Sequence, residues 1–203
     1  MKRLSPQTSC FAAAFTLIEL LLTITIVVAL MGLSLGIQGY ASNKSSRTRA
    51  EVEIRALAAA CESYKADQAD YPRTTYSESL SSFSSNAQLY IQASAGLYMQ
   101  LSGDSRMVGR SDLSQGLIPD GKQQADPVYL EFKPSQLKKD DSKAKVLYIR
   151  DPWDGRGGKP SPYGYSTRRN TLKDDEFAGH NATFDIWSMA AKPDNPNAWI
   201  SNW

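Results

Sequence analysis

The sequence predicts an α+β protein in which a long N-terminal helix rests on a small antiparallel sheet near the C-terminus. No proline occurs between Phe15 and Tyr71, so we expect one helix from Phe15 to about Asp70, with Pro72 as the first residue that must stop it. Short segments rich in β-branched and aromatic residues come only after residue 144, and they predict the strands. Helix first and strands later is the order typical of an α+β domain.

The long helix is expected to have two halves of different character. Phe15 to Gly36 is an almost unbroken apolar run, and about 20 such residues reach across a hydrocarbon core of ~30 Å. Beyond it the helix keeps only a narrow apolar stripe, which includes Ile54, Leu57 and Cys61, for a soluble part to pack on. The sequence therefore divides into a leader at 1–14, a membrane and assembly helix at 15–37, an amphipathic continuation at 38–71 and a globular domain at 72–203.

Glu19 is the one acidic residue within the apolar run. A carboxylate in hydrocarbon costs roughly 2.5–3.5 kcal/mol on insertion scales, so it normally marks a function with a partner. A cut between Ala14 and Phe15 would create an amine about one helical turn from Glu19. Such a pair could form within one helix or between staggered copies, so we expect Glu19 to set the register of assembly.

The segment Ala14-Phe15-Thr16-Leu17-Ile18-Glu19-Leu20 resembles the processing and methylation motif of type IV pilins and of type II secretion pseudopilins. The resemblance implies that a prepilin peptidase cuts before Phe15 and methylates the new N-terminus. Ala14 stands where the family usually has Gly, and both residues are small. The resemblance also implies a pilin-like fold.

Later segments are similar to the major pseudopilin in particular. Tyr64 to Pro72 resembles the end of its long helix, and Asp151-Pro152-Trp153, Phe184 to Ser188 and Ile200 to Trp203 follow in the same order as in that subfamily. Residues 73–146 have no such match. The resemblance thus covers both ends of the chain and leaves its middle to be interpreted from composition alone.

The function implied is that of a structural subunit, not an enzyme, in a type II secretion pseudopilus that drives protein export. Its partners would be copies of itself, minor pseudopilins, the prepilin peptidase and the inner-membrane assembly platform. Lys2 and Arg3 before the apolar run predict a single pass through the inner membrane, with a cytoplasmic N-terminus and a periplasmic C-terminal domain. A type IV pilin for adhesion, motility or DNA uptake is an alternative, and a signal-anchored enzyme or binding domain is another.

We expect no resident cofactor, and calcium is left open as an alternative. Major pseudopilins bind calcium near the C-terminus, where the resemblance implies Ser188, Asp194, Asn195 and Asn197 as ligands. Calcium prefers six to eight oxygen ligands, carboxylates among them. This chain has Ala190-Ala191-Lys192 where the family usually has Gly-Ala-Asp, so most of the expected carboxylates are missing and Lys192 brings a positive charge instead.

The remaining composition excludes several other functions. Two of the 23 basic residues lie in the expected leader, and the others balance the 21 acidic ones, which argues against a nucleic-acid face built on bulk charge. His180 is the single histidine, and no Gly-x-Ser-x-Gly motif occurs, so a catalytic triad is not expected. Cys10 belongs to the leader, and Cys61 is expected to be a small packed side chain.

Within the globular part the sequence predicts one further helix and three strands. Asn86 is expected to cap a helix to about Leu101, with Gly103 as its stop. Residues 77–85 are interpreted as a surface loop and residues 104–144 as an irregular excursion. The strands are expected near 145–150, 163–166 and 183–189, as a meander whose first turn is Asp151 to Gly155.

Overall fold

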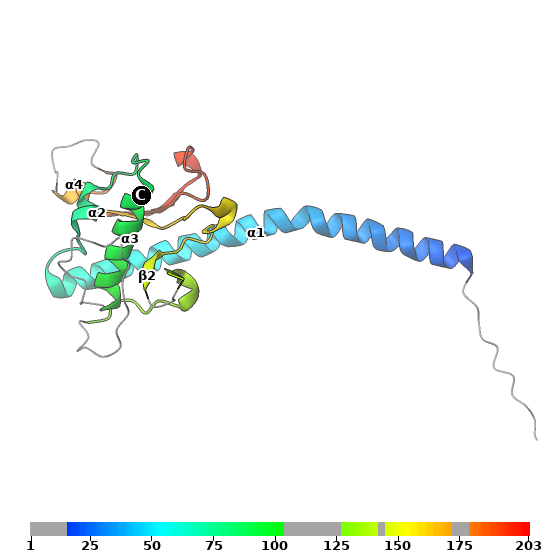
Figure 1. Cartoon of the computed structure of the whole chain (residues 1–203), viewed down its shortest axis with the longest axis horizontal. Helices are drawn as coiled ribbons and strands as arrows, with labels where there is room; N and C mark the ends of the chain where they lie inside the picture. Colours follow the sequence, from blue (N-terminus) through cyan, green and yellow to red (C-terminus); the bar gives the residue numbers. More distant parts are fainter. Residues whose placement is uncertain (1–15, 104–126, 142–144, 172–178) are drawn as a thin grey trace, which may run out of the picture. The chain divides into compact units, whose positions relative to one another are not determined.

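The computed structural model describes residues 16–103, 127–141, 145–171 and 179–203, without the side chains of residues 33–38 and Gly157. The chain forms two compact units, residues 1–44 and 45–203. The described residues form an α+β structure with helices and small antiparallel sheets, as predicted. Figure 1 shows the elements, and their bounds follow below.

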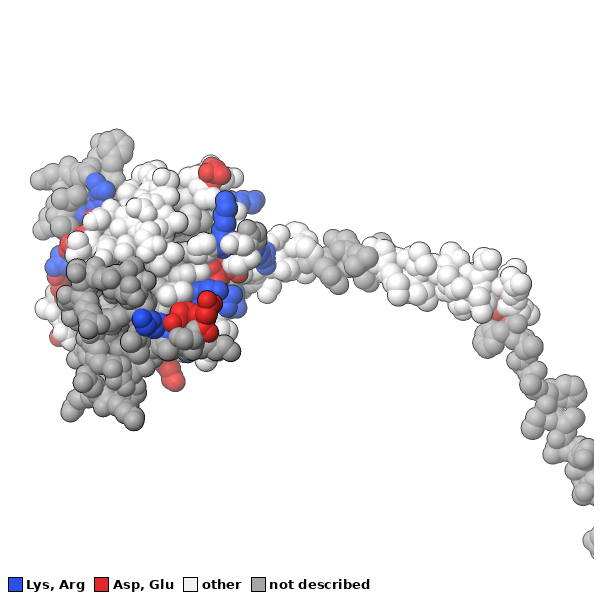
Figure 2. Space-filling model, viewed as in Figure 1, with Lys and Arg blue, Asp and Glu red and all other residues white. Residues whose placement is uncertain are grey.

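Helix α1 runs from Leu17 to Gln68, which confirms the long uninterrupted helix. In unit 1 its described apolar side chains from Leu17 to Met31 are all exposed. Figure 2 shows this stretch as almost free of charged atoms. No helix among the fully described residues has both the length and the hydropathy of a membrane span.

In unit 2, α1 buries the stripe that the sequence predicted. Ala50, Ile54, Leu57 and Cys61 are each at most 2% exposed and belong to the main hydrophobic core. Figure 1 shows α3 and the strands gathered against this half of the helix. Burying an aliphatic side chain contributes roughly 1.5–3 kcal/mol, so this stripe anchors the domain on α1.

The end of α1 lies close to the prediction, two residues before Asp70. The helix stops at Gln68, four residues before Pro72, because Ala69 adopts a left-handed conformation with φ of 62°. Such a residue commonly terminates a helix, although glycine usually occupies the position. The Asp70 side chain then accepts the N–H of Tyr71 at 2.8 Å and pairs with Arg73, which turns the chain away from the helix axis.

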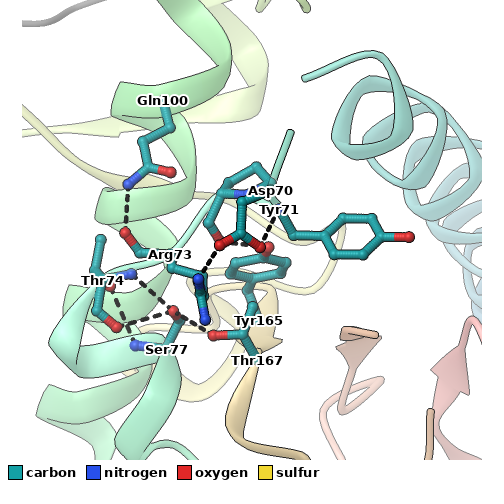
Figure 3. A network of polar contacts seen from close by, with 9 residues as sticks. Asp70, Tyr71, Arg73, Thr74, Ser77, Gln100, Tyr165 and Thr167 are labelled. Atoms are coloured by element: carbon teal, nitrogen blue, oxygen red, sulfur yellow. Dashed lines mark hydrogen bonds and ion pairs between the residues drawn. The ribbon is translucent and has the colours of Figure 1, made fainter. Parts of the chain in front are cut away.

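A network of polar contacts fastens this exit to the rest of unit 2 (Figure 3). The Tyr165 hydroxyl donates to the carbonyl oxygen of Pro72 at 2.6 Å, and Gln100 donates to that of Arg73 at 2.6 Å. The hydroxyls of Ser77 and Thr167 lie 3.0 Å apart. The first two bonds satisfy the carbonyl groups of Pro72 and Arg73, in a segment that belongs to neither helix nor sheet.

The interpretation of residues 77–85 as a surface loop is wrong in part. Helix α2 spans Thr75–Ser79, and Thr74 caps it through reciprocal hydrogen bonds with Ser77. Leu80 is fully buried directly after it. The serines that suggested a solvated loop are used instead for capping and for contacts with the core, which is a frequent role of short hydroxyl side chains.

Helix α3 spans Ala87–Ser102 and confirms the predicted second helix at both ends. The Asn86 side chain accepts the N–H groups of Gln88 and Leu89, and Gly103 ends the helix with φ of 76°. The Ser94 hydroxyl, which lies on this helix, accepts the N–H of Ile149 at 3.1 Å. Helix and sheet are thereby joined by a polar contact inside the core.

In the described part of the chain, five strands form two small sheets, which corrects the expected three-stranded meander. β1 (Leu137–Lys139) pairs antiparallel with β2 (Val146–Ile149). The second sheet has the order β3 (Gly164–Ser166), β4 (Asp185–Ser188) and β5 (Ile200–Ser201), also antiparallel. Among the described residues, one isolated antiparallel bridge, between Arg150 and Pro162, links the end of β2 to the start of β3. The three predicted strands are therefore present, but β2 and β3 do not form a full ladder with each other.

The second half of the expected irregular excursion contains β1, which is a further correction. A 3₁₀ turn at Pro134–Gln136 leads into β1, and a second one, at Pro196–Ala198, leads into β5. Residues 104–126 lie outside the described part of the chain. Lys138 on β1 is exposed, whereas the Asp140 side chain accepts the N–H of Lys145 and closes the hairpin. A short helix, α4 (Arg168–Thr171), and a 3₁₀ turn at Arg156–Gly158 complete the elements.

The predicted turn at Asp151 to Gly155 is confirmed. The Asp151 carboxylate accepts the N–H of Trp153 at 2.7 Å, and Gly155 has φ of 82°. The Asp154 carboxylate accepts bonds from Tyr148 and Arg150, each at 2.8 Å. The turn therefore rests on two carboxylates: that of Asp151 binds a backbone N–H inside the turn, and that of Asp154 binds side chains of β2 and its end.

Candidate functional site

Glu19 begins α1 as one half of a capping box with Thr16. The carboxylate accepts the backbone N–H of Thr16 at 3.2 Å and its hydroxyl at 2.9 Å. In return the Thr16 hydroxyl oxygen accepts the N–H of Glu19 at 3.3 Å. Reciprocal bonds of this kind satisfy two donors that a helix start otherwise leaves unpaired. The same first turn also favours a negative charge, because the partial positive end of the helix lies there.

The side chains around Glu19 form an apolar surface with no protein partner among the described residues. Leu17 is 82% exposed and Val27, eight residues after Glu19, is still 47% exposed. The two hydroxyls of this stretch are satisfied within the helix, since Thr23 donates to the carbonyl of Leu20 and Thr25 to that of Leu21. Glu19 is thus the one described group here whose charge requires a partner.

Two of the predicted processing residues, Ala14 and Phe15, lie outside the described residues. The distance from the Phe15 amine to Glu19 is therefore not part of the described geometry. Thr16, which sequence reasoning passed over, is the partner that the structure places on Glu19. The signal was present in the sequence, because a Thr followed three residues later by Glu at a helix start is the pattern of a capping box.

The candidate calcium ligands are divided between the core and the surface. Ser188 is fully buried on β4, and its hydroxyl donates to Oδ2 of Asp151 at 2.6 Å and accepts the N–H of Ala190 at 3.1 Å. Asp194, Asn195 and Asn197 are exposed in the loop that leads to β5. The Ser188 hydroxyl is already fully engaged, so the described donors do not form the oxygen-rich shell that calcium prefers.

Ala190 and Ala191 hold the loop in an unusual conformation, with φ of 51° and 56°. Side chains other than glycine rarely adopt this region, and each such residue costs roughly 1–2 kcal/mol. These two strained residues come shortly after Ser188, whose hydroxyl binds Asp151. Burial raises the pKa of the Asp151 carboxyl, although its bonds to Ser188 and to the N–H of Trp153 oppose that shift.

His180 lies at the surface, and its ring stacks on Trp203 at a centroid distance of 4.0 Å. Its Nε2 is 3.4 Å from the hydroxyl of Ser82. The nearby Asp185 carboxylate accepts the backbone N–H of His180, so it does not orient the ring as a catalytic triad requires. Within the described residues, no three His, Cys, Asp or Glu side chains are placed to hold a metal ion.

Comparison with protein-family models gave no match. Comparison with curated proteins and with solved structures gave none either. The geometry and the residues themselves are therefore the basis for a proposed function.

Proposed function

We propose that the chain is a structural subunit of a type II secretion pseudopilus and that it assembles through the N-terminal part of α1. In this proposal, a prepilin peptidase cuts before Phe15 and methylates the new amine. The apolar half of α1 lies in the inner membrane before assembly, and copies then pack by these helices. The work of the protein is mechanical, as part of a rod that promotes export.

One observation carries the proposal: a single carboxylate lies at the start of a helix whose apolar side chains are exposed on all sides. Leu17 to Met31 present this surface, and Glu19 is the only charged residue within it. A soluble domain would leave a large apolar patch exposed to water, which normally marks an interaction site. Lipid and neighbouring copies of the same helix are the two surroundings that would cover it.

The capping box supports a role for Glu19 before assembly. In a single subunit Thr16 supplies two hydrogen bonds to the carboxylate, which lowers the cost of keeping it in the membrane. Hydrogen bonds leave the net charge in place, whereas an ammonium from a neighbouring chain would neutralise it. Pairing with that amine is therefore favoured when copies line up, and a missing partner leaves a costly charge in hydrocarbon.

The experiment that tests the proposal is to measure filament incorporation of Glu19→Ala in cells. The variant should insert into the membrane like the wild type but should reach filaments at less than about a tenth of the wild-type level, since a lost buried pair costs on the order of 3–5 kcal/mol. Thr25→Ala is the matched control, because its hydroxyl bonds only to its own helix. Normal filaments from Glu19→Ala would refute the proposal.

A further inference from the structure

The first three charged residues after the apolar run are all positive. Between Leu20 and Ala50 the sequence has no acidic residue, and its charged residues there are Lys44, Arg47 and Arg49. Translocated flanks of a membrane segment are normally depleted in Lys and Arg. The proposed topology places these residues on the translocated side, so their presence requires a reason.

The fold adds a third arginine to the same turn of α1. Arg156, from the 3₁₀ turn Arg156–Gly158, donates through Nη2 to the hydroxyl of Ser46 at 3.0 Å. At 100° per residue, Arg47 lies about 100° to one side of Ser46 and Arg49 about 60° to the other. We call Arg47, Arg49 and Arg156 the basic collar. Figure 2 shows Lys and Arg atoms in blue on the surface of unit 2.

The collar remains accessible to solvent although Arg47 and Arg49 each lie near an acidic residue. The Arg47 side chain is 50% exposed and lies 3.8 Å from Glu51, whereas the Arg49 side chain is 45% exposed and lies 2.8 Å from Glu53. Each Glu follows its Arg by four residues, which is about 6 Å further along α1 from the apolar run. The positive member of each pair is therefore the one nearer to that run.

We propose that the basic collar binds the headgroups of anionic phospholipids, an inference that rests on the proposed membrane insertion of α1. Arg47 follows Gly36 by eleven residues, or about 16 Å along a helix, and a long side chain can return part of that distance toward the headgroups. Attraction to an anionic surface extends over roughly a Debye length of ~8 Å.

The arrangement of the charges favours a membrane over other anionic partners. The collar spans about 160° of the helix circumference, and Lys44 widens that arc to about 220°. A bilayer that surrounds a helix can contact such an arc everywhere at once. A nucleic acid or an acidic peptide would bind along one side and leave part of the arc unused. The collar would hold the soluble domain close to the membrane until the subunit leaves it.

The test uses the full chain reconstituted in vesicles of phosphatidylcholine with about 30% phosphatidylglycerol, so that the anionic lipid is abundant around the protein. Spin-labelled lipids report how strongly each headgroup associates with the protein. Because acidic neighbours such as Glu51 and Glu53 offset part of the collar's positive charge, wild type should prefer phosphatidylglycerol by about threefold. Arg47→Gln with Arg156→Gln should remove at least half of that preference, and so should 0.5 M salt as a chosen screening condition.

The matched control is Arg55→Gln with Lys138→Gln, which removes two exposed charges outside the collar and should keep the threefold preference. Arg47→Lys with Arg156→Lys should also keep the preference, because both positive charges remain. This variant therefore separates the effect of charge from an effect of altered side-chain packing. Equal association of both headgroups with wild type, or an unchanged preference in the collar variant, would overturn the proposal. Collar-dependent binding of an oligonucleotide without a lipid preference would overturn it too. Extraction of the wild-type chain by alkaline carbonate would instead contradict the proposed membrane insertion.

Discussion

The indole of Trp187 lies directly on Gly164 of the neighbouring strand. A Cβ placed on Gly164 would be 2.2 Å from Cε2 of Trp187, which is fully buried. Tyr90, Trp199 and Trp203 surround the same indole, at centroid distances of 5.6, 6.5 and 5.8 Å. The absence of a side chain at Gly164 is therefore what allows this aromatic cluster to form against β3.

Gly164→Ala should destabilise unit 2 strongly, because neither the strand backbone nor the enclosed indole can move easily. Overpacking typically costs about 1–3 kcal/mol. The measurement is the urea midpoint of the full chain, followed by tryptophan fluorescence. Gly39→Ala is the control, since an added Cβ there meets nothing within 4 Å. A wild-type midpoint for Gly164→Ala would show that the contact is not tight.

Ala190→Gly should have the opposite effect. Its φ of 51° is strained for alanine but not for glycine, so the substitution relieves roughly 1–2 kcal/mol in the folded state. The greater conformational freedom of glycine in the unfolded chain offsets about 0.4–1 kcal/mol of this gain in stability. We expect a small net gain in the same urea experiment, and a clear loss for Ala190→Val. A loss for the glycine variant would contradict the assigned conformation.

The Asp151 carboxyl should make stability depend on pH. Burial raises its pKa in the folded state above the usual value of 3.8, so the folded protein keeps this proton over a range where the unfolded chain releases it. The stability gained from this proton is thus fully present below the pKa of Asp151 in the unfolded chain. It is lost as the pH rises through the pKa of Asp151 in the folded protein. Asp151→Asn should lose this part of the pH dependence in unfolding experiments between pH 3 and 7, a range chosen to bracket the shift. If the free energy of unfolding changed with pH equally in the wild type and in Asp151→Asn, the raised pKa of Asp151 would be contradicted.

Thr16→Val should weaken the start of α1 without changing its apolar surface. The valine cannot accept the N–H of Glu19 or donate to its carboxylate, and loss of such a cap costs about 0.5–2 kcal/mol. Hydrogen exchange at the Glu19 amide should accelerate by roughly two- to thirtyfold. Thr16→Ser should restore protection, and Thr23→Val should leave that amide unchanged. Equal exchange in Thr16→Val would show that the capping box does not form.

The long helices were predictable because their signals are local. The absence of proline up to Pro72 predicted α1, and Asn86 with Gly103 predicted both ends of α3. The end of α1 lies two residues before the predicted one because it depends on Ala69 in a left-handed conformation, for which alanine gives no sequence signal. The short elements failed for a related reason. β1 contains two lysines in three residues and is a strand only because β2 pairs with it.

The candidate site was predictable to a similar degree. Glu19 was identifiable from hydropathy alone, and its capping partner Thr16 was within reach of a known pattern. The role of Ser188 was not, because Asp151, the acceptor of its hydroxyl, is 37 residues away in the sequence. Contacts of that kind arise from the packing of β4 against the turn after β2, and a single sequence contains no record of them.

The N-terminus of the protein in its native membrane distinguishes a processed filament subunit from an uncleaved membrane protein. Mass spectrometry of the subunit purified from membranes, without added tags at either end, measures this directly. We expect the mature chain to begin at Phe15 with a methylated amine and to lack residues 1–14. A native chain that keeps those residues, or one that begins at Phe15 without ever entering a filament, would contradict the proposed function.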